Sequence, residues 1–256
     1  MNTLERHEQI LRTLNEQGYV SVPRAAELTG ASSATIRRDL AAFAKQGLAR
    51  RVRGGIRLVE SVGMTPFAMR QAQSFKSKEA LAQRAVQLLK AGDVIFVDGG
   101  TTTFHLGACL PAIPLRVITN SVRLAHYLDE QNQRRAEWEV FLTGGLIYPN
   151  SGLLLGPAAQ ASVTQYHAHW AFLSVGGITL DGLYNTTELV VETERLMIAH
   201  ADQVVVLADS SKLGKHAMCQ VCRLSEVDYL VTNRNDAQTP LLRQFEQAGL
   251  QIVVTG

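Results

Sequence analysis

The segment SSATIRRDLAAFAKQ, residues 32–46, decides how this chain is organised. Read as a helix, it places Ile36, Leu40 and Phe43 on one face, because these residues are four and three positions apart. Ser32 or Ser33 is expected to cap the helix by accepting a hydrogen bond from a free amide of the first turn. By itself the segment also fits an amphipathic surface helix with solvated arginines. The remaining positions carry the hydroxyl and guanidinium groups that contact phosphates and base edges in a DNA groove: Ser33, Thr35, Arg37 and Arg38.

The preceding residues favour DNA binding. Apolar residues recur at helical spacing over residues 4–17, and Gly18 supplies a stop. A short second helix is expected over residues 23–28, because Pro23 suits a first helical turn. Residues 29–31 then form a tight turn into the helix of residues 32–46. Two helices joined by a short glycine-containing turn form a helix-turn-helix, whose second helix enters the major groove.

A basic hairpin is expected after this helix, in GLARRVRGGIRLVE, residues 47–60. Gly47 is expected to end the helix, and two short strands are expected to flank Gly54 and Gly55, which can adopt the positive φ angles that a tight turn requires. Such a wing would lie against the phosphate backbone. If the module neutralises on the order of five phosphates, log affinity falls with log salt at a slope of about −4 to −5. The hairpin carries four arginines: Arg50, Arg51, Arg53 and Arg57.

These stretches resemble the winged helix-turn-helix of DeoR-type bacterial transcriptional repressors. The resemblance rests on residues 19–22, on residues 32–40 with the core Thr35-Ile36-Arg37-Arg38-Asp39-Leu40, and on residues 53–55. It implies that the predicted polar residues of the helix face double-stranded operator DNA. It also implies that Asp39 orients an arginine or caps locally, and does not touch phosphate.

Charge and composition agree with a small basic module ahead of a larger body. Residues 1–57 hold ten Lys and Arg against five Asp and Glu, whereas the whole chain has a net charge of +2. The first part therefore suits a polyanion partner. The N-terminus lacks the apolar core of a signal peptide and no apolar run approaches about 18 residues, so we expect a cytoplasmic protein without a membrane partner. Three cysteines are expected to be free thiols.

The domain organisation follows from the pattern along the chain. We predict a DNA-binding domain over residues 1–59, a linker over residues 60–77 and an α/β domain over residues 78–256, which opens with a helix at residues 78–90. Apolar strands alternate with helices in the last part, which indicates a mostly parallel sheet. The expected strands span residues 94–97, 116–118, 139–142, 170–175, 204–207, 229–231 and 251–254.

Small polar residues follow most of these strands. Because ligands bind beyond the carboxyl ends of strands in open α/β sheets, these residues predict a binding site. The sharpest motif is VIFVDGGTTTFHL, residues 94–106, where glycines allow close backbone approach and threonines open a helix whose amides and dipole favour an anion such as phosphate. A capped helix after a glycine turn is the plainer interpretation. The predicted effector-binding residues are Asp98, Gly99, Gly100, Thr101, Thr102, Thr103, Thr119, Asn120, Gly144, Gly145, Glu188 and Lys212.

Other polar groups are open to two interpretations. Asp181, Glu188 and Glu192 lie in or near a loop that leads into a helix, where they bind sugar hydroxyls or favour the helix dipole. Residues 150–152 form either a closing loop or a turn. Cys219 and Cys222 make a C-x-x-C unit without a second pair, so no metal site is expected. No cofactor is expected either.

The second half resembles the sensor domain of the same family, which is similar to ribose-5-phosphate isomerase. Matching motifs include residues 98–103, 119–120, 144–145 and 209–214. The resemblance implies a repressor released by a phosphorylated sugar or sugar acid. One departure is His169-Trp170, which stands where many members carry an aspartate. A similar pair occurs in members that control ascorbate-type catabolism.

Two functions of different classes are compatible with these patterns, and a transcriptional activator would share the architecture of the first. The first is a repressor of a sugar or sugar-acid catabolic operon, acting as a homodimer or higher homo-oligomer because helix-turn-helix proteins read paired half-sites. Its effector would be a phosphorylated metabolite. The alternative is a sugar-phosphate isomerase with an accessory DNA-binding domain, in which Asp181, Glu188 or Lys212 transfers protons. The sequence favours the regulator, which requires no catalytic residue.

Overall fold

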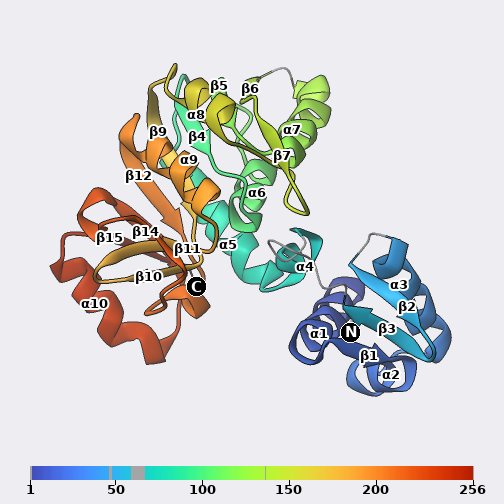
Figure 1. Cartoon of the computed structure of the whole chain (residues 1–256). Coiled ribbons are helices and arrows are strands. Elements are labelled where there is room, and N and C mark those ends of the chain that lie inside the picture. The colour runs from blue at the N-terminus through green and yellow to red at the C-terminus, as the bar shows by residue number, and fades with distance from the viewer. Residues whose placement is uncertain (1, 46–47, 59–66, 136, 256) are drawn as a thin grey trace. The chain divides into compact units, whose positions relative to one another are not determined.

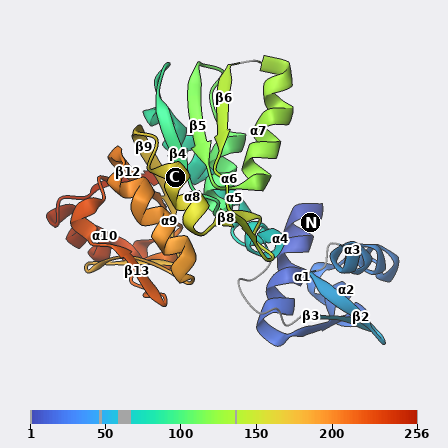
Figure 2. The same cartoon turned by 45° about the horizontal axis from the view of Figure 1, so that its top comes forward.

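The computed structural model describes residues 2–45, 48–58, 67–135 and 137–255, and it divides into two compact units. The first unit ends at Phe75 and the second begins at Lys76. Figure 1 shows both units, and Figure 2 gives a second view of each. None of the described helices is both long and apolar enough to span a membrane.

The first unit is a winged helix-turn-helix. Its three antiparallel strands lie in the order β1-β3-β2, and apolar side chains from all three main helices and the sheet share one core, which includes Ile10, Ile36 and Phe43. The elements are α1 (Thr3–Gln17), β1 (Tyr19–Ser21), α2 (Val22–Thr29), α3 (Ser33–Lys45), β2 (Ala49–Val52), β3 (Gly55–Leu58) and α4 (Phe67–Ala72).

Caps and turns explain the helix ends in this unit. Gly18 and Gly30 end α1 and α2 in the left-handed conformation, at φ of 70° and 67°. Ser32 caps α3, since its hydroxyl accepts from the Thr35 amide at 3.2 Å. The hairpin turn differs from the expected one: Gly54 has φ of 84°, but Gly55 begins β3 and pairs with Val52. A Cβ at Gly55 would overlap the Val20 carbonyl, so this glycine allows β1 to pack closely.

The segment predicted as a linker holds helices where the structure describes it. Helix α4 packs on α1, and Met69 is fully buried in the core of the first unit. The Ser74 amide donates to Glu8 Oε1 at 2.7 Å, which also ties this segment to α1. The expected end of the recognition helix at Gly47 and the linker residues 60–66 lie outside the described residues.

The second unit is built on seven parallel strands in the order β15-β14-β12-β9-β4-β5-β6. All seven strands were predicted from apolar runs, which are typical of parallel strands buried on both faces. Their bounds are β4 (Val94–Val97), β5 (Leu115–Thr119), β6 (Trp138–Leu142), β9 (Ala168–Ser174), β12 (Ala201–Leu207), β14 (Tyr229–Asn233) and β15 (Gln251–Thr255). The sheet is therefore an open α/β sheet of the doubly wound type.

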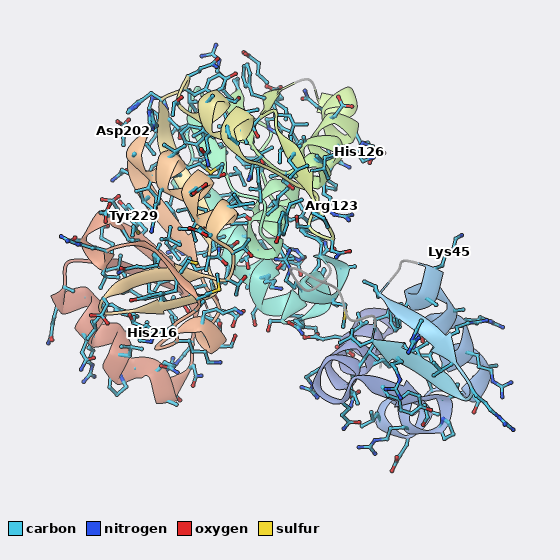
Figure 3. All side chains as sticks on the ribbon, viewed as in Figure 1. Lys45, Arg123, His126, Asp202, His216 and Tyr229 are labelled. Carbon is cyan, nitrogen blue, oxygen red and sulfur yellow. The ribbon has the colours of Figure 1, made fainter. Side chains whose placement is uncertain are left out.

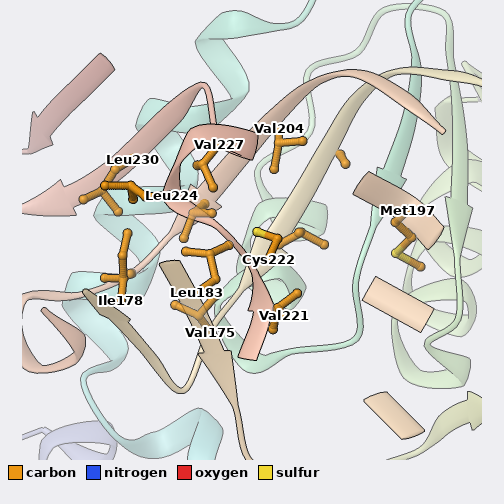
Figure 4. Packing of buried hydrophobic residues seen from close by; sticks show 14 of the residues in the cluster. Val175, Ile178, Leu183, Met197, Val204, Val221, Cys222, Leu224, Val227 and Leu230 are labelled. Atoms are coloured by element: carbon orange, nitrogen blue, oxygen red, sulfur yellow. The ribbon is translucent and has the colours of Figure 1, made fainter. Parts of the chain in front are cut away.

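Helices cover both faces of this sheet (Figures 1 and 2). One core lies between the sheet and α5 (Phe75–Ala85), α6 (Thr101–Ala108) and α7 (Val122–Arg135). The other lies against α8 (Pro157–Val163), α9 (Glu188–Ala199) and α10 (Thr239–Gln247). Alternate residues of β4 serve the two cores, since Ile95 and Val97 face the first and Phe96 faces the second. Figure 4 shows part of the second core.

Short elements complete the second unit. The hairpin β7–β8 stands apart from the main sheet, and three antiparallel strands form a small sheet in the order β10-β11-β13. Their bounds are β7 (Leu146–Tyr148), β8 (Leu153–Leu155), β10 (Gly177–Thr179), β11 (Gly182–Asn185) and β13 (Cys219–Cys222), and the 3-10 turns span Val86–Leu88, Ser210–Lys212, Leu224–Glu226 and Asp236–Gln238.

Candidate nucleic-acid interface and effector site

The recognition helix α3 divides into a buried and an exposed face. Ile36, Leu40 and Phe43 are at most 3% exposed, as their spacing predicts. Ser33, Arg37 and Arg38 are exposed, whereas Thr35 is half-buried. The Thr35 hydroxyl lies 3.0 Å from the Ser32 hydroxyl, so it is part of the helix cap. The start of α3 therefore presents one hydroxyl and two guanidinium groups to solvent.

The wing arginines point to two faces of the hairpin. Arg50 lies opposite Arg57 across the ladder, and Arg51 lies opposite the buried Ile56. Because facing residues of an antiparallel pair share a face, Arg51 is on the other face from Arg50 and Arg57. Arg57 stacks over the Tyr19 ring at 5.9 Å from its centroid. Arg53 lies in the turn, and all four are exposed.

A groove joins the wing to the recognition helix. It has a volume of about 540 Å³ and brings together Ser33, Arg37 and Arg51. Gly54 and Gly55 form part of its wall. Two guanidinium groups and a hydroxyl around one groove suit a phosphate backbone, which accepts hydrogen bonds from such groups. The other predicted DNA-binding residues do not line this groove: Thr35, Arg38, Arg50, Arg53 and Arg57.

Asp39 fixes α3 to α1. Its carboxylate accepts from Arg6 Nε at 2.7 Å and lies 2.9 Å from His7 Nε2. The His7 ring contacts Phe43 edge-on with centroids 4.9 Å apart. Burial raises the pKa of Asp39, but Arg6 and His7 outweigh it and lower the pKa below its ordinary value. Asp39 thus holds the recognition helix, and Arg6 is the arginine that it orients.

The sheet places one set of polar residues at a topological switch point. Strand β9 follows β6 in the chain but lies beside β4, so the crossover direction reverses between β4 and β9. Ligands of doubly wound sheets bind beyond the carboxyl ends of such a strand pair. Asp98 follows β4, and Ser174 ends β9 at this position.

The Asp98 carboxylate bonds entirely within the protein. Oδ2 accepts from the Ser174 amide at 2.9 Å and from its hydroxyl at 3.0 Å. Oδ1 accepts from the Gly100 amide at 3.1 Å and from the Thr103 hydroxyl. Burial raises the pKa of Asp98, although these four donors oppose the rise by stabilising the ionised form. Asp98 therefore ties β9 to the start of α6.

The glycines after Asp98 are required by packing. A Cβ at Gly99 would overlap the Leu153 side chain, and one at Gly100 would overlap the Ser174 hydroxyl. Leu153 is the first residue of β8, so the turn at residues 150–152 leads into a strand that covers the loop between β4 and α6. Both glycines therefore leave room for neighbouring side chains, and their contact with a ligand stays a prediction.

The N-terminus of α6 has no side-chain cap. Gly100 is its N-cap, and the first helical backbone bond runs from the Phe104 amide to the Gly100 carbonyl. The amides of the first turn and the helix dipole thus favour an anion. Thr101 and Thr102 are 7% exposed, and Thr103 is fully buried.

The predicted effector-binding residues at the ends of β5 and β6 differ in their exposure and hydrogen bonding. The Thr119 hydroxyl accepts from the Ser121 amide, which makes it a turn residue. Asn120 is 3% exposed, and its Oδ1 has no hydrogen-bond partner in the described part of the chain. Gly144 and Gly145 are exposed after β6, and Gly145 has φ of 126°. Asn120 is therefore the residue of this set whose unpaired atom suits a ligand.

The two charged candidates come from other elements than the loop between β4 and α6 that holds Asp98. Glu188 is the first residue of α9 and is exposed. Lys212 is half-buried after β12, which adjoins β9, and its ammonium group has no ion pair among the described residues. Asp181 lies in the β10–β11 turn, where its carboxylate is 3.8 Å from His216 (Figure 3 labels His216). Among the described residues, no hydrogen bond or ion pair joins Asp181, Glu188 and Lys212 to one another.

His169 and Trp170 lie at the opposite end of the sheet. The Val94 amide donates to His169 Nδ1 at 2.9 Å, and Trp170 Nε1 donates to Asp93 Oδ2 at 3.2 Å. These contacts hold the amino end of β9 against that of β4. The pair therefore has a structural role at this end of the sheet, away from Asp98.

Sequence reasoning missed Glu194. It is 3% exposed on the buried face of α9, and its Oε1 accepts from Asn185 Nδ2 at 2.8 Å. Burial, and then the neighbouring Asp98, raise the pKa of Glu194 well above its ordinary value. A glutamate three and four positions from Val190, Val191 and Met197 is a visible anomaly on an apolar helix face.

A basic winged helix-turn-helix followed by a doubly wound domain with a polar switch point defines a DNA-binding regulator with a sensor domain. The chain belongs to the DeoR family of transcriptional regulators. The DeoR-like helix-turn-helix domain model matches residues 6–62, and the DeoR C-terminal sensor domain model matches residues 73–234.

The chain is also similar to named relatives and, more distantly, to solved structures. The chain is 33% identical over 255 residues to the HTH-type transcriptional regulator UlaR of Shigella flexneri serotype 5b and to that of Escherichia coli strain SMS-3-5, covering 99% of each chain. Ribose-5-phosphate isomerase A of Methanocaldococcus jannaschii shares 18% identity at a TM-score of 0.35, over 53% of both chains. Translation initiation factor eIF-2B of Pyrococcus horikoshii shares 15% identity at a TM-score of 0.42, over 89% of this chain and 87% of that one.

Proposed function

We propose that this regulator represses a sugar or sugar-acid catabolic operon, and that a phosphorylated metabolite bound in the sensor domain weakens its hold on operator DNA. The uncapped N-terminus of α6 at the switch point carries the proposal, because free amides and the helix dipole favour a phosphate there. Lys212, beyond the neighbouring strand β12, would add a fixed positive charge. The protein would bind this metabolite without turning it over.

The DNA-binding residues form two groups in this proposal. Ser33, Arg37 and Arg51 share a groove, so we propose that they clamp one phosphate backbone. Arg50 and Arg57 lie on the other face of the wing. They contribute to DNA binding through the long-range electrostatic attraction of the basic unit for DNA. Arg51→Ala is expected to weaken operator binding more than Arg50→Ala, measured by fluorescence anisotropy. Equal losses would contradict the clamp.

We also propose a homodimer or higher homo-oligomer, since paired half-sites require two recognition helices. Leu146 and Ile147 of β7 support this, because they are 65% and 61% exposed and apolar. Leu142, at the end of the edge strand β6, is 46% exposed. A second copy would cover these side chains. Sedimentation of wild type and Ile147→Asp tests this, with a smaller species expected for the variant.

The sensor proposal is tested by DNA binding with and without effector. Wild-type protein on the DNA upstream of its neighbouring genes is titrated with ribose 5-phosphate, glucose 6-phosphate and 6-phosphogluconate. Lys212→Ala should bind DNA normally but lose the response, since a ligand acts only through differential affinity. The exposed Lys215 supplies the control variant Lys215→Ala, which should respond fully. Unchanged DNA affinity with every compound would contradict the proposal.

A further inference from the structure

Glu194 is a polar group in an apolar setting. It is one of the buried residues of α9, a helix that contributes Val191 and Met197 to the second core of the sensor domain, and Figure 4 labels Met197. Only 3% of the residue is exposed. A carboxyl group in such surroundings costs free energy unless it is paired, so its hydrogen bonds decide what it does.

One oxygen of Glu194 is paired and the other is not. Oε1 accepts from Asn185 Nδ2 at 2.8 Å, whereas Oε2 has no hydrogen-bond partner in the described chain. The adjoining Arg195 does not neutralise it, because that guanidinium donates to the carbonyls of Val221 and Gln220 at 3.0 and 2.6 Å. Glu194 therefore has one buried oxygen atom, Oε2, that no hydrogen bond of the described chain uses.

The charges around Glu194 favour its neutral form. Asp98 accepts from four protein donors, an arrangement that fits an ionised carboxylate, and a second negative charge beside it is unfavourable. Cys222 in β13 also interacts with Glu194, but burial first and Glu226 second raise the pKa of that thiol to about 12, so it adds no charge at neutral pH. Burial first and the negative charge of Asp98 second therefore favour the protonated form of Glu194 by raising its pKa.

The proton then lies on the unpaired oxygen. Since Oε1 accepts from Asn185, the acid hydrogen belongs on Oε2, where it is a buried donor without an acceptor. Leaving such a donor unsatisfied is unfavourable, because it has lost its hydrogen bonds to water. A ligand oxygen would recover this free energy. A carboxylate is disfavoured as the acceptor, because it would add a charge beside Asp98.

We propose that Glu194 is an effector-binding residue whose neutral acid donates through Oε2 to a hydroxyl or carbonyl oxygen of the sugar moiety. The inference rests on the proposed function, with the effector phosphate at the start of α6. It adds a selection rule: the effector presents an uncharged oxygen to Glu194. Asn185 acts as a positioning residue, because it decides which oxygen carries the proton.

The test compares Glu194→Gln with Glu194→Leu. Glutamine keeps a donor at this position, whereas leucine removes it. Binding of ribose 5-phosphate, glucose 6-phosphate and 6-phosphogluconate is measured by calorimetry. Glu194→Gln should bind within about threefold of wild type, and Glu194→Leu should bind at least about tenfold more weakly. Glu246→Gln, at an exposed position of α10, should match wild type.

Three results separate this inference from the function on which it rests. Wild-type binding should weaken at alkaline pH as Glu194 ionises, while Glu194→Gln should show a flat profile over the same range. An infrared band of a protonated carboxylic acid should appear in ligand-free wild type at pH 7.5 and vanish in Glu194→Gln. A missing band, or equal binding by Glu194→Leu, overturns the inference alone. Failure of every probe to bind wild type overturns the sugar-phosphate proposal, and the inference falls with it.

Discussion

Replacing Asp39 with alanine tests the view that this carboxylate anchors the recognition helix. The change removes the bonds to Arg6 and His7, which are 2.7 and 2.9 Å long. Hydrogen bonds to charged groups contribute about 1.5–3 kcal/mol each. The side chains of Arg6 and Asp39 are 12% and 11% exposed, and His7 is 28% exposed, so solvent weakens the pair only in part. We expect a loss of about 2 kcal/mol.

The loss should be confined to the first unit. For a unit of this size, about 2 kcal/mol lowers Tm by about 8–16 °C. Trp138 and Trp170 both lie in the second unit, so tryptophan fluorescence should report an unchanged transition. Far-UV circular dichroism, which follows all helices, should show an additional early transition. Operator affinity should fall because α3 is no longer held in place.

An exposed ion pair in the same unit provides the control. Arg24 and Glu27 are 2.8 Å apart, but their side chains are 47% and 71% exposed, so Glu27→Ala should change stability by less than about 0.5 kcal/mol. Equal effects of Asp39→Ala and Glu27→Ala would refute the anchoring role. The pH dependence adds a second check. The folded-state pKa of Asp39 is lowered, so its contribution is present above the unfolded pKa and is lost as pH falls through the folded pKa.

Three further substitutions follow from the structure. Gly55→Ala places a Cβ on the Val20 carbonyl, so it should separate β1 from β3 and abolish operator binding. Labelled operator DNA should then show no rise in fluorescence anisotropy when the variant is added. Gly100→Ala overlaps the Ser174 hydroxyl, so it should remove the response to phosphorylated sugars while DNA binding persists. The folded-state pKa of Glu194 is raised, so wild type loses stability as pH rises from the unfolded pKa toward the folded pKa, and Glu194→Gln does not. In urea titrations, the free energy of unfolding of Glu194→Gln relative to wild type should therefore rise by up to about 1.4 kcal/mol per pH unit in this range. A difference in stability between Glu194→Gln and wild type that does not change with pH would contradict the raised pKa of Glu194.

Much of the fold could be predicted because its strongest signals are local. The seven strands of the main sheet are apolar runs, and the periodicity of α3 placed Ile36, Leu40 and Phe43 in the core. Short strands were harder. Strands β1, β7 and β10 have three residues each, which is too short for a recognisable alternation of apolar and polar side chains. Helix α4 was missed because it has six residues and lies in a segment of weak periodicity.

The roles of the site residues depended on tertiary contacts. The contact of Asp98 with a ligand stays a prediction, and the structure adds four donors from β9 and the start of α6 to its carboxylate. No local pattern indicates that Ser174, 76 positions away, would supply two of them. Glu194 was missed for a different reason. Its place on an apolar helix face was visible in the sequence, but only the fold shows that Asp98 lies near it.

The most direct test of the account is the operator affinity of wild-type protein in the presence of matched phosphorylated and unphosphorylated compounds. Anisotropy is recorded with glucose 6-phosphate against glucose, and with 6-phosphogluconate against gluconate, at one fixed salt concentration because affinity for DNA depends on salt. The account predicts that at least one phosphorylated compound weakens DNA binding and that its unphosphorylated partner does not. Equal effects within each pair, or no effect of any compound, would contradict a phosphate sensor at the start of α6.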